Sequence, residues 1–215
     1  PRPGARNHYL TLRDTDVDMS LTVVADSAII GRLDPPLAEG QRILARHGFE
    51  HALAPLLTVS AGMEYVDAPR GQRLFTFEGF ARQPLLGWHE DYVFLQPQIE
   101  AMLRQAIAAD PHVTVHWGAA PPLAELQAMA RFVVGCDGAS SAVRREAGIT
   151  LTDLGYDEPW LVVDVELHHE PQPPLPAIIQ QVCDPRRLAT FVPGHGNHRR
   201  WEFLLARGEE PAPWT

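Results

Sequence analysis

The sequence predicts a mixed fold of the α/β (α+β) class, and three observations support that prediction. Up to about residue 155, short apolar runs alternate with segments of helical periodicity. Beyond Pro159, four strand-like runs follow one another with no helical period between them. The chain has 215 residues, of which 45% are hydrophobic and 21% charged, a composition typical of a globular protein with a buried core.

Residues 1–155 are predicted to form a mixed α/β domain, although residues 1–31 have no clear assignment. Gly48 is placed to end a helix over Leu37–His47, and Pro97 suits the first turn of the next helix because its missing N–H would be unpaired there. Ser140 or Ser141 can cap a later helix that runs to Ala147. Further predicted elements are strands over Leu10–Leu12, Ser20–Val24, Met63–Val66, Arg73–Phe77, Val93–Leu95, Val113–Trp117 and Arg131–Val134, and a helix over Leu123–Met129.

Residues 156–215 are predicted to form part of an antiparallel sheet. The runs of β-branched and aromatic residues that predict its strands are Trp160–Leu167, Ile178–Val182, Leu188–Val192 and Arg199–Leu205. We therefore place a domain boundary near residue 155.

The charge and cysteine content exclude several classes of protein. All 18 basic residues are arginine, and with 27 acidic residues the formal charge is -9, which disfavours general binding to nucleic acid. No apolar run approaches the ~20 residues of a membrane helix. The two cysteines cannot form a disulfide framework, and the N-terminus shows no secretory pattern, so we predict a cytoplasmic protein. Cys136 is expected to pack as a small buried side chain.

The most specific motif is Phe132–Arg144, with the letters FVVGCDGASSAVR. A strand, a glycine-containing turn and a capped helix in this order direct backbone N–H groups toward an anionic ligand. The string resembles the mid-chain Asp-Gly motif of the FAD-dependent aromatic hydroxylases, the class A flavoprotein monooxygenases with the para-hydroxybenzoate hydroxylase fold. The resemblance implies part of an FAD-binding, Rossmann-like domain followed by part of an antiparallel-sheet substrate domain.

Three further segments resemble the same family in the same order. Phe94–Arg104 is similar to its Gln-Pro-x-Leu-Glu helix start, and Pro159–Glu166 to the strand that enters its substrate domain. Arg199–Glu209 resembles a later strand of the 3-(3-hydroxyphenyl)propionate hydroxylase branch. Together these segments extend the resemblance over roughly residues 32–210.

The resemblance implies a set of cofactor-binding residues. Asp137, with Gly138 in the same turn, would lie at the ribityl and pyrophosphate region of FAD, Gln96 near the ribityl chain, and Arg32 at the pyrophosphate. The chemistry suits each role, since a carboxylate accepts from sugar hydroxyls and a guanidinium binds phosphate bidentately. The alternatives are that Asp137 only closes a turn, Gln96 only caps a helix and Arg32 is a surface arginine.

The resemblance also implies the reaction. NADH or NADPH would reduce FAD, and O2 would then hydroxylate a small phenolic aromatic acid such as a hydroxyphenylpropionate, in a protein that can form a homodimer. The strands beyond Trp160 would line the substrate pocket, although no catalytic residue is assigned. Candidate partners for a substrate carboxylate are Arg186, Arg187, Arg199 and Arg200.

Two fingerprints of the family are absent from these 215 residues. No Gly-x-Gly-x-x-Gly occurs, and no late Gly-Asp motif. About thirteen residues also separate Trp117 from Arg131, where the family has meander strands. The chain is therefore interpreted either as a fragment or joined pieces of such an enzyme, or as a non-catalytic, cofactor-free binding module derived from the same fold.

Two other kinds of site are disfavoured. The histidine pairs His112/His116, His168/His169 and His195/His198 lack a tight metal-binding signature, so no metal site is expected. Ser140 and Ser141 do not stand in the Gly-x-Ser-x-Gly sequence of a serine hydrolase.

Overall fold

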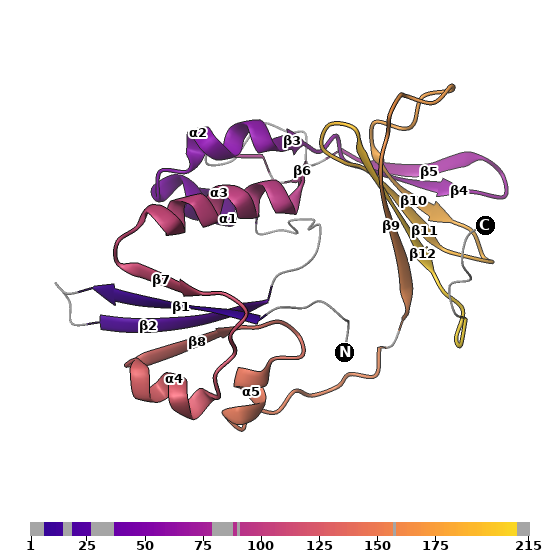
Figure 1. The fold of residues 1–215 in the computed structure, drawn as a ribbon. Coiled ribbons are helices and arrows are strands. Elements are labelled where there is room, and N and C mark those ends of the chain that lie inside the picture. The colour runs from indigo at the N-terminus through magenta and orange to yellow at the C-terminus, as the bar shows by residue number, and fades with distance from the viewer. Residues whose placement is uncertain are drawn as a thin grey trace. The chain divides into compact units, whose positions relative to one another are not determined.

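The computed structural model describes residues 7–14, 19–26, 37–78, 88–89, 91–156 and 158–209, and the side chains from residue 40 onward. The chain divides into two compact units. One comprises residues 1–29 and 100–154, and the other residues 30–99 and 155–215. The division falls inside helix α3 (Gln96–Ala109), and each unit is described by itself (Figure 1).

The first unit is built on a four-stranded mixed sheet. Its strand order is β7 (Val113–His116), β1 (Asn7–Asp14), β2 (Met19–Asp26) and β8 (Phe132–Cys136). Neighbours are antiparallel except β2 and β8, which run parallel with Val23 opposite Val134. Strand β8 ends at Cys136, and the Asp-Gly turn follows directly at Asp137.

Helices α4 (Leu123–Met129) and α5 (Ala142–Glu146) lie on one face of this sheet (Figure 1). Leu126 of α4 is fully buried and packs against Val133 of β8 and Val143 of α5. These contacts join both helices to the strand that precedes the turn. Burial of their apolar area is the main contribution that stabilises this cluster.

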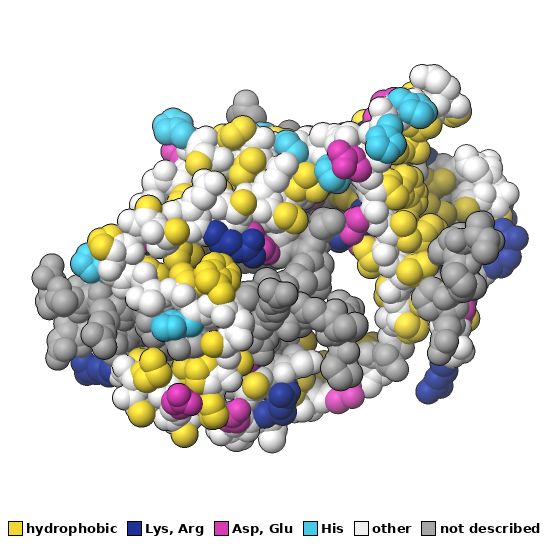
Figure 2. Space-filling view, in the orientation of Figure 1, with side chains coloured by type: hydrophobic (Ala, Val, Ile, Leu, Met, Phe, Trp, Pro, Cys, Tyr) yellow, Lys and Arg dark blue, Asp and Glu magenta, His cyan; other side chains and the backbone are white. Residues whose placement is uncertain are grey.

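The second unit contains a six-stranded sheet. Its strand order is β5 (Gln72–Phe77), β4 (Met63–Asp67), β10 (Ile179–Cys183), β11 (Ala189–Pro193), β12 (His198–Leu204) and β9 (Trp160–Glu166). Neighbours are antiparallel except β4 and β10, which run parallel with Tyr65 opposite Gln181. Apolar side chains reach the surface along this sheet (Figure 2), among them Trp160 and Val162 of edge strand β9.

The rest of the second unit is a helical segment with a small second sheet. It comprises α1 (Leu37–Arg46), α2 (Glu50–Leu53), the 3-10 turn η1 (Ala54–Leu56), and strands β3 (Leu57–Val59) and β6 (Tyr92–Phe94), which pair antiparallel. Among the described residues of this unit, the buried apolar side chains are Leu53, Tyr92, Val93, Phe94, Leu95, Ile99, Ile179 and Phe191. None of the helices within the described residues is long and apolar enough to span a membrane.

The mixed fold class is confirmed, and so are the principal helices and strands. Gly48 ends α1 with a φ of 81°, α4 covers the predicted residues, and Ser141 rather than Ser140 caps α5. The short elements α2, η1 and β3 were not predicted, because three or four residues carry no readable period.

The two predicted domains, 1–155 and 156–215, remain a prediction. The compact units divide the chain at residue 154/155 as well, but they also place residues 30–99 with the C-terminal segment. The physical reason is that β4 pairs with β10, more than a hundred residues later, which brings β4 and β5 into the same sheet as β9 to β12.

Candidate functional site

The Asp-Gly turn is organised around the carboxylate of Asp137. This side chain is only 7% exposed, and its Oδ2 accepts hydrogen bonds from the backbone N–H groups of Ala142 at 2.7 Å and Val143 at 3.2 Å. Its Oδ1 accepts from the hydroxyl of Ser141. The carboxylate therefore satisfies the first N–H groups of α5, which have no partner within the helix.

Ser141 completes the cap of this helix. Its Oγ accepts from the backbone N–H of Arg144 at 2.9 Å, while its own N–H donates to the carbonyl of Gly138 at 3.1 Å. Gly138 has a φ of 79°, in the left-handed region that favours glycine. A Cβ on Gly135 would lie 3.0 Å from a methyl group of Val143, so strand and helix meet closely at this position.

The hydrogen bonds determine the charge state of Asp137. Burial by itself raises the pKa of the carboxyl group, but the bonds from Ser141 and from the N–H groups of Val143 and Ala142 outweigh it, so the pKa lies below its ordinary value. The group is therefore a carboxylate at neutral pH. Its three bonds use most of the roughly four acceptor positions of a carboxylate. Asp137 consequently fits the role of holding the turn better than that of a direct acceptor for a sugar hydroxyl.

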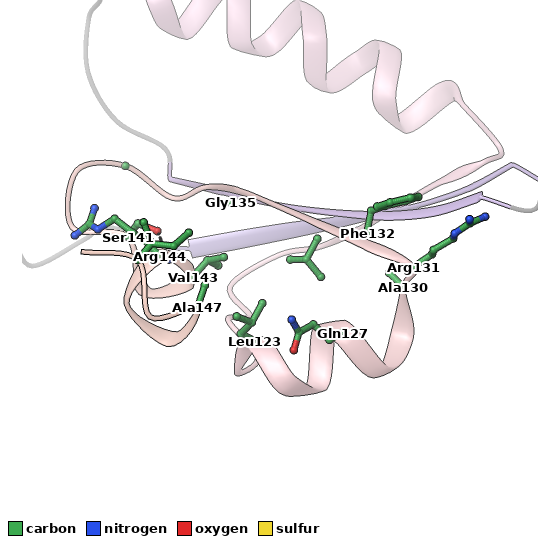
Figure 3. Close-up of a pocket in the computed structure, with 13 residues that line it drawn as sticks. Leu123, Gln127, Ala130, Arg131, Phe132, Gly135, Ser141, Val143, Arg144 and Ala147 are labelled. Carbon is green, nitrogen blue, oxygen red and sulfur yellow. Dashed lines mark hydrogen bonds between the residues drawn. The ribbon is translucent and has the colours of Figure 1, made fainter. Parts of the chain in front are cut away.

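A cavity of about 820 Å³ lies next to this turn, between β8 and helices α4 and α5. Figure 3 shows Arg131 and Phe132 at one end of it and Ser141 and Arg144 at the other, with apolar side chains between. Gly138 also lines the cavity. Both guanidinium groups have contacts, since Arg144 donates to the carbonyl of Ala139 at 2.7 Å and Arg131 lies 5.4 Å from the ring centre of Phe132.

The other predicted cofactor residues lie elsewhere. Gln96 is the first residue of α3, is partly buried and belongs to the second unit, whereas Asp137 and Gly138 belong to the first. Arg32 lies outside the described residues. The structure therefore brings Asp137 and Gly138 together, and the roles of all four residues toward FAD remain predictions.

All four arginines predicted to bind a substrate carboxylate pair with acidic side chains. Arg186 contacts Asp184 with two guanidinium nitrogens, at 2.8 and 3.1 Å, and Arg187 contacts Glu209 at 2.7 Å. Arg200 binds both carboxylate oxygens of Asp164, at 2.8 and 2.9 Å. A bidentate partner of this kind neutralises the guanidinium and occupies its best donor geometry.

Arg199 differs because it lines a second cavity, of about 320 Å³, within the second unit. Arg199 and Arg200 are neighbours on β12, so their side chains point to opposite faces of the sheet. Arg199 pairs with Glu170 at 2.5 Å, and Glu170 also lines the cavity. The sequence offered no signal for Glu170, since it stands 29 residues from Arg199 in an irregular segment.

Comparison with known proteins gives consistent results. Residues 122–215 match the family model described as an FAD binding domain. A probable NADH-specific resorcinol 4-hydroxylase from Rhodococcus jostii is 30% identical over 185 residues, 78% of this chain and 34% of that protein. A 3-(3-hydroxy-phenyl)propionate/3-hydroxycinnamic acid hydroxylase from Burkholderia cenocepacia is 32% identical over 141 residues, 58% of this chain and 25% of that protein.

This chain is a relative of the FAD-dependent aromatic hydroxylases. Its fold agrees, since the structure of PqsL, a probable FAD-dependent monooxygenase from Pseudomonas aeruginosa, superposes with a TM-score of 0.59 at 19% identity, covering 84% of this chain and 51% of that one. The chain matches about a third or less of the length of the two hydroxylases named above. The matched family segment of this hydroxylase relative begins just before α4 and includes the Asp-Gly turn, α5 and strands β9 to β12.

Two other predictions about side chains can be compared with the structure. Cys136 is exposed, so the prediction that it is buried was wrong; it ends an outer strand of the four-stranded sheet, where no further element covers it within the described residues. His195 Nδ1 and the hydroxyl of Thr58 form a hydrogen bond of 2.8 Å. Within the described ranges, no group of three or more His, Cys, Asp or Glu side chains is placed to hold a metal ion.

The pairing of Arg186 gives a testable expectation. The hydrogen bond from the Arg186 side chain, with a second from its backbone N–H, lowers the pKa of Asp184 to about 2. We expect Arg186→Ala to raise that pKa toward the ordinary aspartate value of about 3.9, measured by NMR titration of the carboxyl carbon. An unchanged pKa in the variant would show that Arg186 does not pair with Asp184 in solution and is free for another anion.

Proposed function

We propose that this chain provides the Asp-Gly turn and part of the substrate-binding sheet of an FAD-dependent hydroxylase. The enzyme would use NADH or NADPH with O2 to hydroxylate a phenolic acid of the hydroxyphenylpropionate type. One observation supports this most directly. The turn between β8 and α5, built around the buried carboxylate of Asp137, lies inside the segment that matches the FAD binding domain.

The residues of this chain would act by positioning. Asp137 and Ser141 hold the turn and the start of α5, which places Gly138 at the edge of the larger cavity. Because Gly138 has no side chain, a ligand can approach its backbone closely. By resemblance, Gln96 and Arg32 would contact the ribityl chain and the pyrophosphate. FAD, when bound, supplies hydride acceptance and oxygen activation.

Retention of FAD tests this proposal. We expect the full chain, incubated with excess FAD and desalted, to keep the visible absorption bands of bound flavin. Gly138→Ala should lower retention several-fold, because a Cβ would occupy the close approach and strain the backbone. Gly148→Ala is the matched control, since Gly148 has a similar φ of 71° at the other end of α5 but open space around it.

The outcomes separate the proposal from its alternative. A folded chain without flavin would contradict FAD binding by this chain alone and would leave two interpretations, a fragment of a longer enzyme or the cofactor-free binding module. Equal losses in both glycine variants would show that strain, rather than cofactor contact, caused the effect. A loaded chain would then be assayed with NADH and 3-(3-hydroxyphenyl)propionate, and we expect a product one oxygen atom heavier.

A further inference from the structure

The cavity of about 320 Å³ in the second unit combines an ion pair, Arg199 with Glu170, and apolar walls. This volume is near the lower end of the roughly 300–1,000 Å³ range of small-molecule sites. Val93, Leu175 and Pro193 contribute apolar surface, and the hydroxyl-bearing Thr58 lies on the wall. Arg199 supplies the positive charge. A ligand that matches this lining has an apolar body and an anionic end.

Two backbone carbonyl groups hold the guanidinium of Arg199, but one of its N–H donors lacks an acceptor among the described residues. Its side chain is 12% exposed, and Nη1 donates to the carbonyl oxygens of Gly196 at 2.9 Å and His198 at 2.8 Å. These backbone contacts fix the guanidinium without neutralising it. Its Nε is buried and has no hydrogen-bond acceptor among the residues that the structure describes. A buried donor without an acceptor is destabilising, and an added ligand oxygen would supply the missing acceptor.

Glu170 supplies the carboxylate that contacts Arg199, and it does so through one hydrogen bond. Its Oε1 accepts from Nη2 at 2.5 Å, and its side chain is 52% exposed. Because about half of the Glu170 side chain is exposed, water can solvate its carboxylate when it leaves Arg199. Glu170 stands in the irregular segment between β9 and β10, so its displacement disturbs no regular element.

We propose that Glu170 is a displaceable internal carboxylate and that Arg199 binds the carboxylate of an aromatic acid in its place. An incoming carboxylate can contact Nη2 and Nε together, in the side-on bidentate geometry that a guanidinium favours. It thereby satisfies the donor that Glu170 leaves unpaired. The identity of the ligand rests on the proposed function, whereas its binding does not require the flavin.

Binding of a matched pair of probes tests this inference on the full chain without FAD. The probes are 3-phenylpropionate and its neutral analogue 3-phenylpropanamide, with dissociation constants measured by calorimetry or ligand-observed NMR. We expect the acid to bind more tightly than the amide. Glu170→Gln should tighten acid binding several-fold by removing the competing charge, and Arg199→Gln should weaken it at least as much. Neither variant should change binding of the amide.

The opposite signs distinguish a binding role from structural damage, because a variant that merely disturbed the fold would weaken binding at both positions. Arg186→Gln serves as the control, since Arg186 is 84% exposed and lies outside the lining of this cavity. Equal affinities for acid and amide, or acid binding unchanged in Arg199→Gln, would overturn the inference. Probe binding and FAD retention are separate measurements, so failure of this inference would not by itself contradict the proposed function.

Discussion

Replacing Asp137 by alanine is expected to destabilise the unit that contains β8 and α5 by about 3 kcal/mol. The substitution leaves three donors without their acceptor: the hydroxyl of Ser141 and the N–H groups of Ala142 and Val143. It also removes the negative charge from the start of a helix. The free energy of unfolding is measured by urea denaturation followed by circular dichroism.

Two further variants allow the loss of unfolding free energy in Asp137→Ala to be compared with smaller changes at the same turn. Asp137→Asn keeps the shape but retains only one oxygen acceptor, so its loss should be intermediate. Ser141→Ala removes the N-cap and should cost about 1 kcal/mol. A loss for Asp137→Ala no larger than that for Ser141→Ala would contradict the central place of the carboxylate in the turn.

The same variant predicts a pH dependence of definite sign. Because the folded-state pKa of Asp137 lies below its unfolded value of about 3.9, the stability it contributes is fully present above that pH. It is lost as the pH falls through the folded pKa. The difference in unfolding free energy between the wild-type chain and Asp137→Ala should therefore shrink below about pH 4. A difference that grew on acidification would show that the pKa is raised in the folded state.

Gly62→Ala is expected to have a comparable or larger effect, a loss of about 3–5 kcal/mol. Gly62 has a φ of 111°, and a Cβ there would lie 2.2 Å from the carbonyl oxygen of Phe77, at the end of the hairpin formed by β4 and β5. Neither backbone can yield without breaking the sheet. Because residues 58–61 line the smaller cavity, we also expect weaker binding of 3-phenylpropionate.

Gly71→Ala provides the control at the other end of the same hairpin. Gly71 has a φ of 60°, and a Cβ there would meet nothing within 4 Å, so only the backbone cost of about 1–2 kcal/mol applies. Thermal and urea denaturation of the two variants, measured together, compare strain alone with strain plus collision. Equal losses would show that Phe77 does not approach Gly62 in solution.

Local sequence signals predicted most of the secondary structure and the centre of the candidate site. Helix α4 matches its predicted residues, and the capping role of a serine before α5 follows from hydrogen bonds within a few residues. The turn at Asp137 was predicted from one short string for the same reason, since all its partners lie within six residues. Such contacts depend on local geometry, which the amino-acid order specifies directly.

The sequence by itself determined the mixed fold class, the Asp-Gly turn and the relationship to flavin-dependent hydroxylases. Only the tertiary structure decided which arginine lines a cavity. Arg199 and Arg200 are adjacent and chemically identical, but their side chains point to opposite faces of the sheet. Arg199 therefore pairs with Glu170, 29 residues away, and Arg200 with Asp164, 36 residues away. Tertiary structure likewise placed β4 beside β10. Pairing between strands that are distant in the sequence depends on how whole surfaces pack, so the local periodicity of either strand does not predict it.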